Sequence, residues 1–401
     1  MKLTSPSAPL SRNPGEVETV GNLDLPPHAL PLREGTGFGK TGNLQIRVCM
    51  VGGYSPDYPR QQIIRVGLER VGVEVIELQM NRKARTQLLY RELLHRWPET
   101  RQCDVILVAA FNQRIAPLVW LLAKLSGKPV IVDYMVGLTD GTVEERRNVR
   151  GTTTFLYRQV DRFNVQRMTS LTDTQCHREA YRRLLGSTVN QMKVLPVGVY
   201  DGWFSPQQAP EGDPLLVQFF GSYIPFHGID VILQAAAFLR DDSRLQFELI
   251  GRGQTYPASV ALARSLDLHN VRFSEVVPAP LLPSRVAQAA ICLGVFGARE
   301  KTAYVVPNKV FQCMALGRPV ITAESPALLE CFTPGQHLVA VTPGNPQSLA
   351  DAIRRLADSP QERARLGEAA AARIQETYLP QHIGARLKGI IEELIPQFTG
   401  H

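Results

Sequence analysis

Two lysines, Lys301 and Lys309, lie in one short segment whose pattern is typical of a phosphate site. An apolar strand is expected over 291–296, followed by a polar loop. A helix is expected over 307–316, because proline is favoured at the first helical position. The free amides of Asn308 and Lys309 would point out of that helix start, where the macrodipole favours an anion. Lys309 adds a formal positive charge there, so the segment predicts a site for phosphate groups.

Other loops with glycine and basic residues follow predicted strands and should reach the same edge of a sheet. They are 221–228, 251–253 and 297–306, in addition to the helix start at 307–309. Glycine lets a backbone approach a ligand closely. Arg252 and His227 add basic groups to the two lysines. We therefore expect an anionic ligand at this edge, and the alternative is ordinary turn chemistry after the strands.

Apolar strand-like runs alternate with longer amphipathic stretches along the chain, which predicts parallel sheets covered by helices. The expected strands are 46–51, 73–78, 104–110, 130–134, 215–220, 245–250, 271–274, 291–296, 319–322 and 337–341. The fold class is therefore α/β, with two doubly wound domains facing a cleft. Ligands of such sheets bind at the carboxyl ends of the strands.

The pattern divides the chain of 401 residues into five parts. They are a disordered tail over 1–43, an N-terminal domain over 44–198, a linker over 199–214, a C-terminal domain over 215–379, and a helix over 380–401 that packs back toward the N-terminal domain. The tail and the linker are rich in glycine and proline and lack an apolar period.

Composition excludes several classes of protein. No run of about 20 apolar residues predicts a transmembrane helix, and the first residues lack the apolar core of a signal peptide. The six cysteines are scattered, as free thiols in a reducing cytoplasm would be. No His-Glu-x-x-His or Asp-x-Asp motif supports a metal site, and no motif supports nucleic-acid binding.

The net charge of +7 is unevenly placed. Residues 44–198 carry 23 Lys and Arg against 14 Asp and Glu, whereas residues 199–401 carry 17 against 19. The basic half could face an acidic membrane surface or an anionic acceptor. The alternative is that its arginines lie on ordinary solvated helices. We expect a cytoplasmic protein, with peripheral attachment at the inner face of a membrane as an open alternative.

Several stretches together resemble the retaining group 1 (family 4-like) glycosyltransferases of the GT-B fold, over about 44–394. FFGSYIPFHG resembles the phosphate loop of that family, and ELIGRGQ resembles a strand end. VVPNKVFQCMALGRPVI resembles the signature helix and its exit, and VLPVGVYDGWFSP resembles the linker. The resemblance implies two Rossmann-like domains. It also implies transfer of a sugar from a nucleotide-diphosphate sugar to an acceptor hydroxyl, with retention of anomeric configuration.

The chain departs from the pattern of this family at four positions. The two glutamates that the family usually carries, separated by seven residues, fall on Tyr304 and Gln312. The usual arginine and lysine of the phosphate loop fall on Ser222 and His227. Lys301 and Lys309 could restore the missing positive charge from the other side. Gln312 could still bond a ribose hydroxyl as a neutral group.

The resemblance implies a set of donor-binding residues without a divalent metal or other cofactor. We expect catalytic roles for Lys301 and Lys309, because negative charge grows on the leaving diphosphate. The residues expected to bind the donor are Gly221, Ser222, Tyr223, His227, Gly251, Arg252, Gly253, Val306, Asn308 and Gln312.

The first domain is expected to hold the acceptor, a carbohydrate or a lipid-linked molecule. Candidates at its strand ends are Gly52, Gly53, Tyr54 and Asp133. Asp140 could orient or deprotonate the acceptor hydroxyl, and its alternative role is to cap a following helix.

Two other functions remain open at this point. A sugar-nucleotide epimerase of the same shape would need a pair of basic groups at the sugar, and no arrangement in the sequence demands one. A non-catalytic nucleotide-sugar-binding protein would have lost its activity together with the glutamates.

Overall fold

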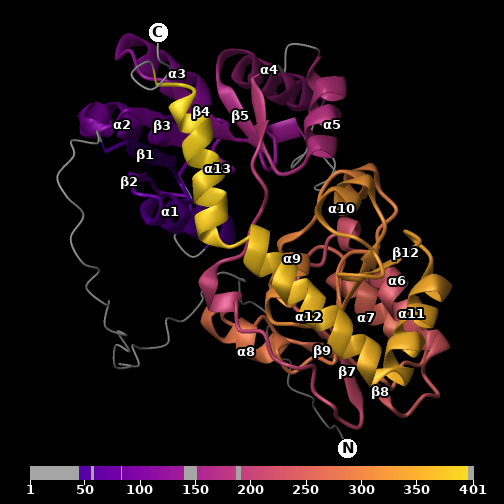
Figure 1. Ribbon diagram of the computed structural model, residues 1–401. Coiled ribbons are helices and arrows are strands. Elements are labelled where there is room, and N and C mark those ends of the chain that lie inside the picture. Colours follow the sequence, from indigo (N-terminus) through magenta and orange to yellow (C-terminus); the bar gives the residue numbers. More distant parts are fainter. Residues whose placement is uncertain (1–44, 56–57, 83, 140–150, 187–190, 396–401) are drawn as a thin grey trace, which may run out of the picture. The chain divides into compact units, whose positions relative to one another are not determined.

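The computed structural model describes residues 45–55, 58–82, 84–139, 151–186 and 191–395 (Figure 1). Within residues 45–395, the described strands form two parallel sheets of six strands each. The first sheet has the order β2-β1-β3-β4-β5-β6 and the second β12-β11-β10-β7-β8-β9. This confirms the predicted fold class of two doubly wound α/β halves.

The first sheet is built from β1 (Arg47–Gly52), β2 (Glu74–Gln79), β3 (Val105–Val108), β4 (Val130–Asp133), β5 (Thr169–Thr172) and β6 (Met192–Val194). Alternate residues of β1 enter different cores, since side chains of a strand point to opposite faces. Val48 and Met50 lie in one core, whereas Cys49 and Val51 lie in the other. The sheet is therefore buried on both faces, as parallel sheets usually are.

Helices cover both faces of the first sheet. One face packs on α1 (Pro59–Arg70) and α13 (Pro380–Glu392). The other face packs on α2 (Thr86–Arg96), α3 (Ala116–Leu125), α4 (Gly151–Arg167) and α5 (Gln175–Leu185). Strands β5 and β6 were absent from the sequence prediction, because TSLT and MKV are short and only partly apolar.

The second sheet consists of β7 (Leu215–Phe220), β8 (Leu245–Ile250), β9 (Val271–Ser274), β10 (Ile291–Leu293), β11 (Val320–Ala323) and β12 (Val339–Val341). One core includes α6 (Ile229–Phe238), α7 (Tyr256–Ser265) and α11 (Pro346–Asp358). The other includes α8 (Leu282–Val286), α9 (Asn308–Ala315), α10 (Pro326–Cys331) and α12 (Pro360–Thr377). All six strands of this sheet were predicted to within a few residues.

The last helix returns to the first sheet. Helix α12 ends at Thr377, and α13 begins at Pro380 and packs against α1 (Figure 1). The two helices meet backbone to backbone, since a Cβ atom on Gly384 would stand only 2.0 Å from the carbonyl oxygen of Gly67. Helix α13 therefore packs on α1, the first helix of the N-terminal half.

Candidate functional site

Helix α9 begins at Asn308, one residue later than expected. Pro307 has an extended backbone, with φ −72° and ψ 150°, and is the N-cap residue. Asn308 and Lys309 are thus the first two helical residues. Their backbone N–H groups have no partner within the helix, because the first turn of any helix leaves its amides unpaired. The expected helix start is present at the carboxyl ends of β7 and β10.

Lys309 does not extend into solvent from this helix start. Its side chain is 5% exposed, and Nζ lies 3.7 Å from the centroid of the Phe219 ring. Among the described residues, Nζ has no hydrogen-bond partner. Burial lowers the pKa of Lys309 well below its ordinary value. A buried amine that lacks both a hydrogen bond and a counter-ion is costly, so its surroundings favour an incoming anion.

His227 lies close to this amine, and Lys301 lies near enough to His227 to affect its charge. Nδ1 of His227 hydrogen-bonds the carbonyl oxygen of Ser222, so Nδ1 carries the proton. Burial first, and then the charges of Lys309 and Lys301, hold the pKa of His227 well below its ordinary value. His227 is therefore neutral near pH 7. The formal cations here are Lys301, which is 6% exposed, and Lys309, whose ammonium form a bound anion would favour.

The glycine loops bring the backbone to Lys309. Gly221 has φ +141°, and a Cβ atom there would stand 2.9 Å from Nζ of Lys309. Gly251, with φ +127°, packs so tightly that its Cβ would lie 2.1 Å from the carbonyl oxygen of Gly221. Gly253 lies against the backbone of Tyr223. Gly221 thus borders the amine, whereas Gly251 and Gly253 hold the two loops together.

A cavity of about 240 Å³ opens beside Gly221 at the ends of β7, β8 and β9. Its walls are mainly apolar, with polar groups from Ser222 and Arg252. The lining residues are Phe220, Gly221, Ser222, Ile250, Gly251, Arg252, Val276, Val277 and Leu282. A flat apolar group could occupy this cavity while an attached anion reaches Lys309. The sequence analysis missed Val276, Val277 and Leu282, which follow β9 and could have been found as another strand-end loop.

Arg252 is held at the rim of this cavity. Its guanidinium lies 3.8 Å from the centroid of the Tyr256 ring and pairs with Glu275. Nη1 is buried and has no hydrogen-bond partner within the described parts of the chain. Arg252 therefore offers the cavity a donor that remains unused in this structure.

Three further residues were predicted to bind the donor, and two of them, Tyr223 and Val306, have fully buried side chains. Tyr223 is fully buried, and its hydroxyl donates to the carbonyl oxygen of Leu249 at 3.2 Å. The Val306 side chain belongs to the core beneath α9. Both side chains pack in the core below the candidate site, and their predicted donor contacts stay a prediction. Gln312 is 8% exposed and lies one turn after Lys309 on the same helix.

The acceptor candidates that follow β1 form hydrogen bonds or close contacts within the N-terminal half. The backbone N–H of Gly53 donates to Oδ1 of Asn112 at 2.8 Å, and a Cβ atom on Gly52 would collide with the same side chain. The hydroxyl of Tyr54, a buried residue, donates to Glu77 at 2.8 Å. The Tyr54 hydroxyl is therefore bound to β2, and the acceptor role of Tyr54 stays a prediction.

Asp133, another predicted acceptor-side residue, is held in a buried ion pair. Its Oδ2 accepts a hydrogen bond from Nε of Arg60 at 2.8 Å, and both side chains are nearly inaccessible to solvent. Arg60 also donates to the carbonyl oxygens of Leu195 and Pro196. The carboxylate of Asp133 joins β4 to α1 and to the chain after β6. Asp140, the other acid candidate, lies outside the described residues.

Residues outside the predicted donor and acceptor sets connect the first half to the helix start of α9. Tyr58, just before α1, lies beside Asn308, and burial followed by the nearby Asp133 charge raises its pKa to about 12. Thr174 Oγ1 donates to the carbonyl oxygen of Tyr304 at 2.8 Å. The ring of His177 lies 5.1 Å from that of Tyr304. The loop after β1 and the start of α5 thus border the candidate site.

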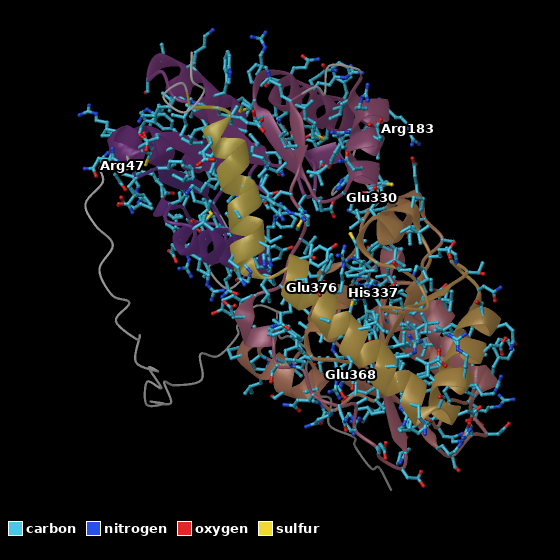
Figure 2. All side chains as sticks on the ribbon, in the orientation of Figure 1. Arg47, Arg183, Glu330, His337, Glu368 and Glu376 are labelled. Carbon is cyan, nitrogen blue, oxygen red and sulfur yellow. The ribbon has the colours of Figure 1, made fainter. Side chains whose placement is uncertain are left out.

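A second connection lies at the start of α5. The carboxylate of Glu330, on α10, accepts hydrogen bonds from the amides of Gln175 at 2.7 Å and Cys176 at 2.6 Å. A cavity of about 260 Å³ lies beside these contacts and includes Arg183 and Tyr304 in its lining. Figure 2 labels Glu330 and Arg183 on either side of this region. The Glu330 carboxylate of the second half thus accepts hydrogen bonds from the unpaired N–H groups at the start of a helix in the first half.

No group of three or more His, Cys, Asp or Glu side chains within the described ranges is arranged to hold a metal ion. The six cysteines are all free thiols. Among the helices that the structure describes, none has both the length and the apolar character that a membrane span requires.

Comparisons with known proteins agree with this geometry. Residues 232–389 match a family model described as glycosyl transferase-like. The MMP alpha-(1->4)-mannosyltransferase of Mycolicibacterium hassiacum is 25% identical over 211 residues, which are 51% of this chain and 49% of that protein. This chain spans about half the length of the curated relatives it matches.

Two solved structures extend the likeness to most of the chain. Anabaena HepE in complex with UDP and glucose has a TM-score of 0.66 at 15% identity, covering 87% of this chain and 100% of that one. WaaG, a glycosyltransferase involved in lipopolysaccharide biosynthesis, has a TM-score of 0.61 at 15% identity, covering 86% and 100%. At such identities the likeness shows the fold. The chain has the GT-B fold, and its resemblance to GT-B glycosyltransferases is confirmed.

Proposed function

We propose that this protein is a glycosyltransferase that moves a hexosyl group from a nucleotide-diphosphate sugar to an acceptor hydroxyl, with retention of anomeric configuration. The observation that carries the proposal is the Lys309 amine, which is buried and without a hydrogen-bond partner among the described residues. It lies between Phe219 and Gly221, beside an apolar cavity. A nucleotide diphosphate supplies a flat base for such a cavity and an anion for such an amine.

The likeness to known proteins supports the same reaction class. The mannosyltransferase of M. hassiacum carries its activity in its name, and HepE has been solved with UDP and glucose. For this chain we propose a nucleotide sugar as donor, with no divalent metal or other cofactor. We also propose a carbohydrate or a lipid-linked molecule as acceptor.

Lys309 and Lys301 would act on the leaving group. Cleavage of the sugar–phosphate bond places growing negative charge on the diphosphate, and cations held in a water-poor site stabilise that charge. The amides at the start of α9 and the backbone at Gly221 would add preorganised dipoles. His227 is neutral, so it would accept a hydrogen bond at Nε2 or contact the sugar without adding charge.

The acceptor would approach from the first half of the chain. Tyr58 and the start of α5 border the helix start of α9 through contacts to Asn308 and Tyr304. We propose Asp140 as the group that orients the acceptor hydroxyl.

The test is a thermal-shift series with UDP, GDP, ADP and their sugar conjugates, with a chelator present, followed by an acceptor screen with the donor that binds. A ligand at 100 times its Kd should stabilise the protein by about 2.7 kcal/mol. We expect one nucleotide diphosphate and its sugar to raise the melting temperature and the sugar to be transferred. A protein that binds the donor but transfers sugar to no acceptor would favour the non-catalytic alternative. No shift with any of these nucleotides would refute the donor site.

A further inference from the structure

An exposed apolar surface lies on the outer side of α3 and α4, which contact each other over the first sheet (Figure 1). Four large side chains of these helices are mostly open to solvent. They are Leu121 at 47%, Leu125 at 78%, Phe155 at 66% and Leu156 at 59% exposed. We name this surface the α3–α4 face. Scattered apolar residues are normal on a protein surface, but several on two adjacent helices mark an interaction site.

Aromatic rings and cations join the two helices on this face. Trp120 of α3 and Phe163 of α4 meet edge to face, with ring centroids 5.3 Å apart. Nζ of Lys124 lies 5.2 Å from the Trp120 centroid, and the guanidinium carbon of Arg167 lies 5.5 Å from it. Two cations are thus held over aromatic rings of the same two helices that carry the exposed leucines and phenylalanine.

The charge of this region has one sign. Residues 116–128 and 151–167 contain Lys124, Lys128, Arg158, Arg162 and Arg167, and their only acid is Asp161. Asp161 is fully buried, and it accepts hydrogen bonds from Tyr134 and from Thr139. No described carboxylate of these two segments is therefore exposed beside the cations.

We propose that the α3–α4 face docks this protein on a membrane surface that contains anionic lipids. Leucine, phenylalanine and tryptophan side chains bind at the boundary between head groups and acyl chains, and lysine and arginine pair with anionic head groups. A bilayer supplies both partners at once. The uniform positive charge matches anionic lipid rather than a typical protein surface, where both signs are interspersed. The proposal is independent of glycosyl transfer.

The test is flotation of the full chain with vesicles of phosphatidylcholine, with and without phosphatidylglycerol. We expect binding to the anionic vesicles and weaker binding as salt rises. The double variant L125Q/F155Q should bind at least about tenfold more weakly, since each side chain loses its apolar contact with lipid. Lys124→Gln and Arg167→Gln should each weaken binding roughly fivefold.

Phe238→Gln is the matched control, because Phe238 is also an exposed phenylalanine, at 54%, on α6, which packs over the second sheet. It should bind vesicles as the unchanged protein does. All variants should keep the melting temperature, since the changed side chains are exposed.

Three results would overturn the proposal. One is absence of binding to anionic vesicles, and another is equal binding by L125Q/F155Q. The third is a dimer, without vesicles, that L125Q/F155Q converts to a monomer in sedimentation velocity, because the face would then bind a second copy of this chain. Nucleotide thermal shifts report separately on the donor site, so failure of one proposal leaves the other measurable.

Discussion

Lys309 is the residue whose environment is hardest to explain without a ligand. The side chain is buried against Phe219, and burial lowers the pKa of its amine. An anion placed beside the amine would favour the ammonium form and raise that pKa again. Binding of a nucleotide diphosphate should therefore be coupled to proton uptake. Affinity should fall as the pH rises through the pKa that Lys309 has in the free protein, since the neutral amine no longer pairs with the anion.

Calorimetry of UDP binding in two buffers of different ionisation enthalpy measures this uptake, at a pH where the diphosphate is already fully ionised. Lys309→Met should abolish both the uptake and most of the binding. It should also raise the free energy of unfolding of the ligand-free protein by about 0.5–2 kcal/mol, because the substitution removes a buried amine that serves function rather than stability. Lys193→Met is the control, since Lys193 is an exposed lysine paired with Glu393. Proton uptake that persists in Lys309→Met would assign it to another group.

At the scale of elements, Asp133 joins a strand end, a helix and the chain after β6 through Arg60. Asp133→Asn leaves the Arg60 guanidinium buried without its counter-ion. We expect it to lower the free energy of unfolding by about 3–5 kcal/mol. Denaturant titration measures the loss.

The matched control is Glu69→Gln, which breaks the exposed pair with Arg65 on α1 and should cost at most about 0.5 kcal/mol. If Asp133→Asn left stability unchanged but removed transfer to the acceptor, the residue would have the acceptor role that its position after β4 first suggested.

At the scale of the whole molecule, Glu330 links α10 of the second half to the N-terminus of α5 in the first. Its two hydrogen bonds are charge-assisted and use amides that a helix leaves unpaired. Glu330→Gln should lower the free energy of unfolding by about 1–2 kcal/mol. Denaturant titration at low and high salt measures this, and the difference should shrink as salt rises.

Glu179→Gln serves as the comparison for Glu330→Gln. Glu179 lines the same cavity, but it pairs with Arg182 on its own helix at the surface. Its replacement should change stability by no more than about 0.5 kcal/mol. Equal losses for the two variants would mean that the carboxylate of Glu330 adds nothing beyond ordinary surface charge.

The sequence by itself determined the α/β fold class with two parallel sheets and the sheet edge where the candidate site lies. Both follow from local pattern, because apolar strands, helical periods and glycines after strands repeat over short stretches of chain. It also located the start of α9 to within one residue. The short strands β5 and β6 were not predicted, because such short and partly polar stretches show no clear alternation of apolar residues.

Only the tertiary structure decided what individual side chains do. Lys309 and His227 both carry a basic group in the sequence, yet burial makes one a free amine over Phe219 and the other a neutral ring. Asp133 meets Arg60 across 73 residues of chain. Tertiary packing brings partners this distant together. Whether a side chain is buried, and so whether its pKa shifts or its carboxylate is paired, cannot be seen in the neighbouring residues of the sequence. The contacts of Asp133 and Tyr54 therefore became visible only in the tertiary structure.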